Sequence, residues 1–163
     1  MRIIFMGTPM FALPSLEKIY KEHEVIAVFT KADKPNARGK KINYSPIKEF
    51  ALANNLRIYQ PETFKDEALI EEIKNMQPDL IVVVAYGKIL PKEVLDIPKY
   101  GIINLHSSLL PRFRGAAPIN AAIINGDKKS GVSIMYVEEE LDAGDVILQE
   151  ETEITDEDTF LSL

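Results

Sequence analysis

The stretch Leu80-Ile81-Val82-Val83-Val84-Ala85 decides the fold, because it is apolar at every position. A strand with one face in water alternates apolar and polar residues, whereas a strand covered on both faces is apolar throughout. The β-branched side chains of this run also favour extended backbone. We therefore predict a central parallel strand over residues 80–84.

Similar short runs recur on both sides of this strand and alternate with segments of helical pattern. Strands are expected at residues 2–6, 24–30, 56–59 and 101–105, and helices at 12–20, 46–54, 66–75 and 118–125. Such alternation predicts an α/β protein with a doubly wound, mostly parallel, Rossmann-like sheet. Two more strands, at 130–137 and 146–153, are expected to flank an acidic, glycine-containing loop over 138–145.

The last residues predict the start of another helix. Thr155-Asp156-Glu157-Asp158 resembles a capping box, and Phe160 and Leu161 begin an apolar stripe. A single amphipathic turn has few packing partners. We therefore expect that residues 1–163 form one domain of a longer protein, interrupted within its last helix.

Composition restricts the class of protein. The chain has 163 residues, no cysteine, two histidines and a net charge of −6. These features argue against disulfides, thiolate chemistry and a histidine-rich zinc site. No signal peptide or membrane span is evident. We expect a metal-free cytoplasmic protein.

The first predicted strand runs into Gly7-Thr8-Pro9, at the position of a ligand-binding turn between strand and helix. The turn lacks the G-x-G-x-x-G fingerprint, which argues against a nicotinamide dinucleotide. Gly7 could equally serve only to permit a tight turn.

Asn104 and His106 lie two residues apart at the carboxyl end of the strand expected at 101–105, so they should share one face. Ligands of open α/β sheets bind at this end of the strands. An amide and a titratable imidazole would there suit carbonyl chemistry. Alternatively, the histidine is satisfied by a backbone carbonyl and the asparagine braces the next turn.

Asp142 is a candidate partner for His106. Its carboxylate could orient the imidazole, favour its charged form and accept protons through water. Asp145 is the obvious rival in the same Leu141–Asp145 segment. Both aspartates could also be ordinary turn residues.

Residues 31–41 form a basic segment with five basic residues and one acid, in an otherwise acidic chain. A local charge of this kind suits contact with phosphates. A solvated charge run would look similar.

Ser108-Leu109-Leu110-Pro111-Arg112-Phe113-Arg114-Gly115, directly after Asn104-x-His106, resembles the signature of folate-dependent formyltransferases and 10-formyltetrahydrofolate hydrolases. Within that superfamily, four further motifs resemble the methionyl-tRNA formyltransferase family: Met6-Gly7-Thr8-Pro9-x-Phe11, Arg38-Gly39-Lys40-Lys41, Tyr86-Gly87-x-Ile89-Leu90-Pro91 and Arg114-Gly115-Ala116-Ala117-Pro118-Ile119. The resemblance covers essentially the whole chain. Ala37 departs from it, because the family often has glycine there.

The resemblance implies transfer of a formyl group from 10-formyltetrahydrofolate to the free amine of methionyl initiator tRNA, with no metal. It also implies the site residues. These are a catalytic set of Asn104, His106 and Asp142; a folate set of Ser108, Leu109, Leu110, Pro111, Gly87, Lys88, Ile89 and Leu90; and a tRNA set of Arg38, Lys40 and Lys41.

The family continues into a C-terminal β-barrel that helps to hold tRNA, which this sequence lacks. Two other enzyme activities remain open, namely hydrolysis of 10-formyltetrahydrofolate and formylation of another amine. A folate- or RNA-binding module without turnover is the alternative outside enzymes. A serine nucleophile is not expected at Ser107 or Ser108, because the G-x-S-x-G motif is missing.

Overall fold

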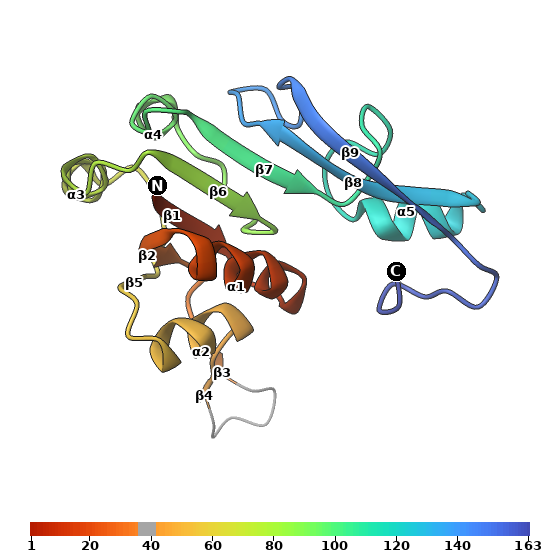
Figure 1. Ribbon diagram of the computed structural model, residues 1–163, viewed down its shortest axis with the longest axis horizontal. Helices are drawn as coiled ribbons and strands as arrows, with labels where there is room; N and C mark the ends of the chain where they lie inside the picture. The colour runs from red at the N-terminus through yellow and green to blue at the C-terminus, as the bar shows by residue number, and fades with distance from the viewer. Residues whose placement is uncertain (36–41) are drawn as a thin grey trace. The chain divides into compact units, whose positions relative to one another are not determined.

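The computed structural model describes residues 1–35 and 42–163 (Figure 1). The chain divides into two compact units, Met1–Ile102 and Ile103–Leu163. Each unit is built around its own set of paired strands, and each is described by itself.

The first unit contains a parallel sheet. Its strands are β1 (Arg2–Gly7), β2 (Glu24–Phe29), β5 (Ile58–Tyr59) and β6 (Leu80–Val84), in the order β5-β2-β1-β6. Every pairing among them is parallel. These pairings confirm the predicted mostly parallel α/β sheet, and β6 forms at the residues expected of it.

Both faces of this sheet are covered. The consecutive residues Ile4, Phe5 and Met6 of β1 are each 0% exposed, although neighbouring side chains of a strand point to opposite faces. Only a sheet with packed layers on both sides buries such a run. The apolar pattern of the sequence therefore reports the layering correctly.

Three helices lie between these strands in the sequence, α1 (Leu13–Glu22), α2 (Pro46–Ala53) and α3 (Glu67–Asn75), and the short α4 (Lys92–Leu95) follows β6. A 3-10 turn, η1 (Met10–Ala12), precedes α1. Helix α1 packs against α2 (Figure 1). The rings of Tyr20 and Phe50 meet there edge to face, with their centres 5.5 Å apart. Helix α3 packs against α4.

Side chains cap two of these helices. The hydroxyl of Ser45 accepts a hydrogen bond from the Lys48 amide at the start of α2, and the carboxylate of Asp66 accepts one from the Ala68 amide at the start of α3. Each cap satisfies an amide that has no partner within the helix. A short antiparallel pair, β3 (Lys34–Pro35) and β4 (Ile42–Asn43), was not expected from the sequence.

The second unit is antiparallel. Strand β7 (Ile102–His106), whose first residue belongs to the first unit, pairs with β8 (Lys129–Tyr136), and β8 pairs with β9 (Val146–Glu153). Helix α5 (Pro118–Ile124) packs against β8 and buries Pro118 and Ala122. The strands expected at 130–137 and 146–153 are confirmed.

The prediction of a helix that begins near Thr155 is wrong, because residues 155–163 form turns. Part of the capping pattern does form, since Asp158 accepts hydrogen bonds from the amide and the hydroxyl of Thr155, both at 2.8 Å. Phe160 and Leu161 are 54% and 91% exposed. A single helical turn without packing contacts gains too little free energy to offset the entropy lost on ordering its backbone, so the segment remains a series of turns.

No helix within residues 1–35 and 42–163 is long and apolar enough to cross a membrane.

Candidate active site

His106 ends β7, and its imidazole is almost fully buried in the second unit. Its Nε2 atom lies 2.9 Å from the backbone carbonyl oxygen of Phe113. A carbonyl oxygen can only accept, so this hydrogen bond requires a proton on Nε2. A backbone carbonyl of this kind is the partner of His106 that the sequence allowed as the alternative to a catalytic role.

Asp142 approaches the other side of the same ring. Its Oδ2 atom lies 3.7 Å from His106 Nδ1, and the two side chains are only 8% and 9% exposed. The same oxygen accepts a hydrogen bond from the Gly115 amide at 2.7 Å. The structure therefore brings His106 and Asp142 together, as the sequence predicted.

Asp145, the rival carboxylate, is exposed, and its backbone carbonyl accepts a hydrogen bond from the Tyr136 amide. Asp145 is therefore fixed to β8 through its main chain. Between the two aspartates, the geometry selects Asp142 as the partner of His106.

The imidazole of His106 lies between two groups that can accept hydrogen bonds. A carbonyl oxygen faces Nε2 and a carboxylate faces Nδ1, and both of these groups accept hydrogen bonds.

Asn104 lies on the same strand as His106, two positions earlier. In the pairing of β7 with β8, Asn104 is opposite Met135 and His106 is opposite Ser133. Side chains two apart on a strand project from the same face, so the amide and the imidazole are presented together. The side chain of Asn104 is half-buried.

The backbone around this pair adopts left-handed conformations. The φ angles are 56° at Phe113, 85° at Gly115, 58° at Ala117 and 50° at Asp142. Such angles cost free energy for residues other than glycine and are often found at functional sites. Here they direct the Phe113 carbonyl and the Gly115 amide toward His106 and Asp142, respectively.

The predicted folate residues of the second unit form the segment Ser108–Pro111. This segment is hydrogen-bonded to Ser133, which is 0% exposed. The Ser133 hydroxyl donates to the Ser108 carbonyl at 2.6 Å and accepts from the Leu110 amide at 3.1 Å. Gln149 adds hydrogen bonds to Ser133 at 2.8 Å and to the Leu110 carbonyl at 2.9 Å. The peptide bond between Leu110 and Pro111 is cis.

Further contacts extend this support. Ser108 is 1% exposed, and its hydroxyl donates to the Arg112 carbonyl at 2.7 Å. Ser108 is thus a hydrogen-bonding residue of the loop. Arg112 in turn forms an ion pair with Asp127 at 2.9 Å. Leu109 is half-buried, and Pro111 is exposed.

The other predicted folate residues follow β6 in the first unit. Gly87 has a φ of 67°, and Lys88 donates from Nζ to the Glu62 carbonyl at 2.6 Å. Ile89 is 86% exposed, whereas Leu90 is 8% exposed.

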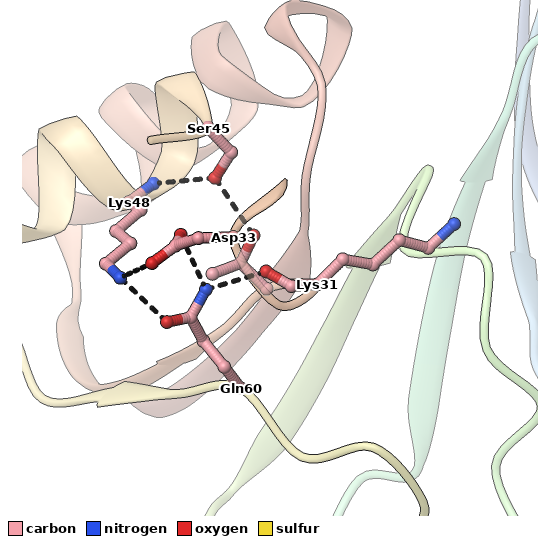
Figure 2. A network of polar contacts seen from close by, with 6 residues as sticks. Lys31, Asp33, Ser45, Lys48 and Gln60 are labelled. Atoms are coloured by element: carbon pink, nitrogen blue, oxygen red, sulfur yellow. Dashed lines mark hydrogen bonds and ion pairs between the residues drawn. The ribbon is translucent and has the colours of Figure 1, made fainter. Parts of the chain in front are cut away.

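The predicted tRNA residues Arg38, Lys40 and Lys41 lie outside the described residues. Asp33 lies in the described part of the basic segment 31–41. Its side chain belongs to a network of polar contacts with Lys48 and Gln60 (Figure 2).

Sequence reasoning missed the groups that position the candidate residues. The carbonyl of Phe113 and the amide of Gly115 belong to the backbone, which every residue carries, so side-chain chemistry gives no signal for them. Ser133 and Gln149 also escaped notice. Each is a polar residue within a predicted strand. Because a strand with one exposed face carries polar residues there, this polarity did not mark Ser133 or Gln149 as special.

Comparison with known proteins places the chain in a class. The model of the formyl transferase family matches residues 1–163. The chain therefore belongs to the formyl transferase family.

Close relatives are methionyl-tRNA formyltransferases. The protein of that name from Fusobacterium nucleatum subsp. nucleatum is 90% identical over 163 residues, which are 100% of this chain and 53% of the relative. That from Alkaliphilus oremlandii is 56% identical over 160 residues, 98% of this chain and 52% of the relative. The chain thus spans about half the length of the curated relatives it matches.

Solved structures share the fold. The phosphoribosylglycinamide formyltransferase of Bacillus halodurans matches with a TM-score of 0.79 and 26% identity, over 99% of this chain and 84% of that chain. The formyltetrahydrofolate deformylase of Pseudomonas syringae pv. tomato matches with a TM-score of 0.75 and 25% identity, over 97% of this chain and 53% of that chain. The predicted formyltransferase fold is confirmed.

Proposed function

We propose that this chain is the catalytic domain that transfers a formyl group from 10-formyltetrahydrofolate to the amine of methionyl initiator tRNA. The observation that carries the proposal is the buried pair of His106 and Asp142, held by the backbone of Phe113 and Gly115. The names of the close relatives support methionyl-tRNA as the acceptor of the formyl group, and membership of the formyl transferase family supports the transfer reaction.

His106 and Asn104 serve the carbonyl in this mechanism. As the amine attacks the formyl carbon, the formyl oxygen gains negative charge, and an imidazolium N–H and an amide N–H stabilise it. Because Nε2 of His106 already donates to the Phe113 carbonyl, the substrate oxygen must replace that carbonyl as its acceptor. Binding of substrate would thus exchange one acceptor for another.

Asp142 has two roles in the proposal. Its carboxylate faces His106 Nδ1 and orients the ring, and through a water molecule it takes the proton that the amine loses. The Gly115 amide holds the carboxylate in place without neutralising it. When the tetrahedral adduct collapses, the bond between the formyl carbon and N10 of the folate breaks, and N10 receives the proton that Asp142 took from the amine. No covalent enzyme intermediate is needed, because the amine itself is the nucleophile.

Two predicted segments, Ser108 to Pro111 of the second unit and Gly87 to Leu90 of the first unit, are each proposed to contact the folate. The Ser133 and Gln149 contacts give the first segment a fixed backbone, and a rigid backbone can recognise a heterocycle by its amides and carbonyls. A cytoplasmic location, expected from the sequence, is part of the same proposal.

Hydrolysis of the formyl donor is the second candidate, because a formyltetrahydrofolate deformylase shares the fold. In that reaction water replaces the amine. Asp142 would serve as the base for either nucleophile.

The test is a single-turnover assay with 10-formyltetrahydrofolate. It uses this chain and an extended protein, made by adding to this chain the part of the Fusobacterium nucleatum relative that the chain does not match. Formylmethionyl-tRNA as the main product supports the proposal. Release of formate at the same rate with and without methionyl-tRNA would instead identify a hydrolase, and folate binding without either product would identify a binding module.

A further inference from the structure

Arg112 joins several parts of the second unit. Its carbonyl oxygen accepts from the hydroxyl of Ser108 at 2.7 Å, and its amide donates to the Leu109 carbonyl at 3.1 Å. Its guanidinium nitrogen Nη2 lies 3.0 Å from Oδ1 and 2.9 Å from Oδ2 of Asp127. The centre of the guanidinium also lies 4.9 Å from the centre of the Phe113 ring. Arg112 therefore links the loop that follows β7 to Asp127.

Asp127 is fixed at the end of α5. Its amide donates to the Ala122 carbonyl at 3.1 Å, and the amide of Gly126 donates to the Ile123 carbonyl at 3.0 Å. Gly126 has a φ of 71°, so the two hydrogen bonds form a Schellman motif, a common way for a helix to end. Helix α5 packs against β8 (Figure 1). The side chain of Asp127 therefore extends from a firmly held backbone position.

The carboxylate of Asp127 depends on Arg112 for a compensating charge. The Asp127 side chain is 11% exposed, and Asn125 donates from Nδ2 to its Oδ1 atom at 2.6 Å. Its Oδ2 atom is shielded from solvent and has no hydrogen bond among the described residues, although the guanidinium lies 2.9 Å away. Moving the cation away would leave a shielded carboxylate unpaired, which is strongly unfavourable. The pair therefore restricts where Arg112 can lie.

The residue after Arg112 is the one that meets His106. Phe113 has a φ of 56°, and its carbonyl oxygen accepts the hydrogen bond from His106 Nε2 at 2.9 Å. Left-handed backbone costs free energy for a residue with a side chain and persists only where the surroundings hold it. Here the surroundings include the guanidinium beside the Phe113 ring and the ion pair that restrains Arg112.

We propose that Arg112 and Asp127 are positioning residues for His106. By restraining Phe113, they hold the carbonyl oxygen that orients the imidazole and keeps a proton on Nε2 until the substrate oxygen replaces it. Neither residue is assigned a contact with the reacting atoms. The inference rests on the proposed function, since it serves the histidine of the formyl transfer step.

The first measurement is the exchange of the His106 Nε2 proton with water, followed by NMR of this chain in a His23→Asn background. Asp127→Asn is compared with Asp156→Asn. Asp156 is the matched control, because it also pairs with a cation, Lys128 at 2.8 Å, but is 92% exposed. We expect Asp127→Asn to speed the exchange about tenfold, because the acceptor of the proton is no longer restrained. Asp156→Asn should leave the exchange unchanged.

The Leu110 amide provides an internal control in the same samples. It donates to Ser133 at 3.1 Å, and that contact does not involve Asp127. Its exchange should therefore stay the same in Asp127→Asn. Equal acceleration at Leu110 and His106 would show that the substitution loosens the whole loop, and would overturn the positioning role.

The second measurement is the single-turnover rate of formyl transfer by the extended protein. Asp127→Asn and Arg112→Gln should each lower this rate about tenfold, equal to about 1.4 kcal/mol in the barrier. The folate Kd should stay within about twofold, because Ser133 and Gln149 hold Ser108 to Leu110 without this pair. Arg112→Lys should recover most of the rate, since only one guanidinium nitrogen contacts Asp127 and an ammonium can replace it.

A double variant tests whether the two residues act as one unit. Asp127→Asn combined with Arg112→Gln should lose no more rate than the weaker single variant, because either change breaks the same pair. Additive losses would mean that the residues act apart and would overturn the inference. If Asp127→Asn does not fold, Arg112→Gln is used in its place, with Lys128→Gln as the control. The side chains of Arg112 and Lys128 are 57% and 77% exposed.

The outcomes distinguish this inference from the proposed function. Equal rates and equal proton exchange in Asp127→Asn and Asp156→Asn, in a protein that formylates methionyl-tRNA, would overturn the positioning role alone. Parallel loss of rate and folate affinity would show that the pair only supports the loop, and would also overturn it. Absence of methionyl-tRNA use by the unmodified extended protein would overturn the proposed function, and the proton exchange of His106 would then decide the positioning role by itself.

Discussion

The Nε2 atom of His106 donates to the carbonyl oxygen of Phe113 across 2.9 Å, while Nδ1 of the same ring faces Asp142 at 3.7 Å. The imidazole is therefore bracketed by two acceptors before any substrate arrives. This arrangement makes the state of the ring a measurable property of the free protein.

We expect nitrogen NMR of the histidines to show a proton on His106 Nε2 in the free protein. The chain has two histidines, and His23 is exposed, so His23→Asn leaves a single signal to assign. The Phe113 carbonyl requires this proton, whichever form Nδ1 takes. A spectrum dominated by the tautomer with a bare Nε2 would contradict the contact and the mechanism built on it.

Replacing His106 by alanine should lower the rate of formyl transfer by about 10² to 10⁴, the usual contribution of a positioned acid or base. Folate affinity should change little, because the imidazole is assigned to charge that develops in the transition state. Single-turnover rates and folate titration of the extended protein measure the two effects. Turnover within a few-fold of the unmodified protein would remove His106 from the chemistry.

The two aspartates of the 138–145 loop provide a matched pair of variants. Asp142→Asn keeps an oxygen that can accept from the Gly115 amide but removes the charge beside His106, so formyl transfer should fall by about 10², the low end of such effects. Asp145→Asn should leave the rate almost unchanged, since that side chain is exposed. Equal losses in the two variants would show that only the acidity of the loop matters.

The strands of the sheet could be predicted from the sequence, because a strand that is buried on both faces has a continuous run of apolar residues. The run at Ile81–Val84 could be interpreted without knowing its neighbours, and the polar change at Asn104 and His106 marked the carboxyl end of a strand. The choice of Asp142 over Asp145 needed either the family resemblance or the structure. Both residues have the chemistry, and only a long-range approach to His106 separates them.

Other features depended on partners that sequence pattern does not reveal. The β3–β4 pair has only two residues in each strand, too few for any periodicity. The helix expected from the Thr155 to Asp158 capping pattern is absent, because a cap alone does not supply the packing that sustains a helix. The Phe113 carbonyl is directed at His106 by backbone angles that no side-chain pattern encodes.

Ser133→Ala should destabilise the second unit and weaken folate binding together. The substitution removes the acceptor of the Leu110 amide and the donor to the Ser108 carbonyl, and leaving such buried groups unpaired costs about 1 to 3 kcal/mol. Chemical denaturation and folate titration measure the two effects. Ser162→Ala, on an exposed turn, is the control. A stable Ser133→Ala protein with normal folate affinity would show that the Ser108–Pro111 backbone does not need this support.

Tyr86 presents the opposite case, a buried hydroxyl without a partner among the described residues. The side chain is 1% exposed, and its ring packs edge to face against Phe64 with centres 6.2 Å apart. An unpaired buried hydroxyl loses its hydrogen bonds to water and gains nothing in return. Tyr86→Phe should therefore leave the free energy of unfolding unchanged or raise it by up to about 1 kcal/mol.

The pH dependence of that comparison gives a second, independent reading. Burial raises the pKa of the Tyr86 hydroxyl well above its usual range, so in alkali the unfolded chain loses this proton before the folded one does. Stability linked to Tyr86 is complete below pH of about 10 and decreases as the pH rises through that value. The advantage of Tyr86→Phe over the unmodified chain should then grow between about pH 9 and pH 11 in denaturant titrations. Tyr86→Phe that is less stable at pH 7, or whose difference from the unmodified chain does not grow with pH, would mean that the hydroxyl has a partner or is hydrated. Folate titration of the same variant would then show whether it serves the ligand.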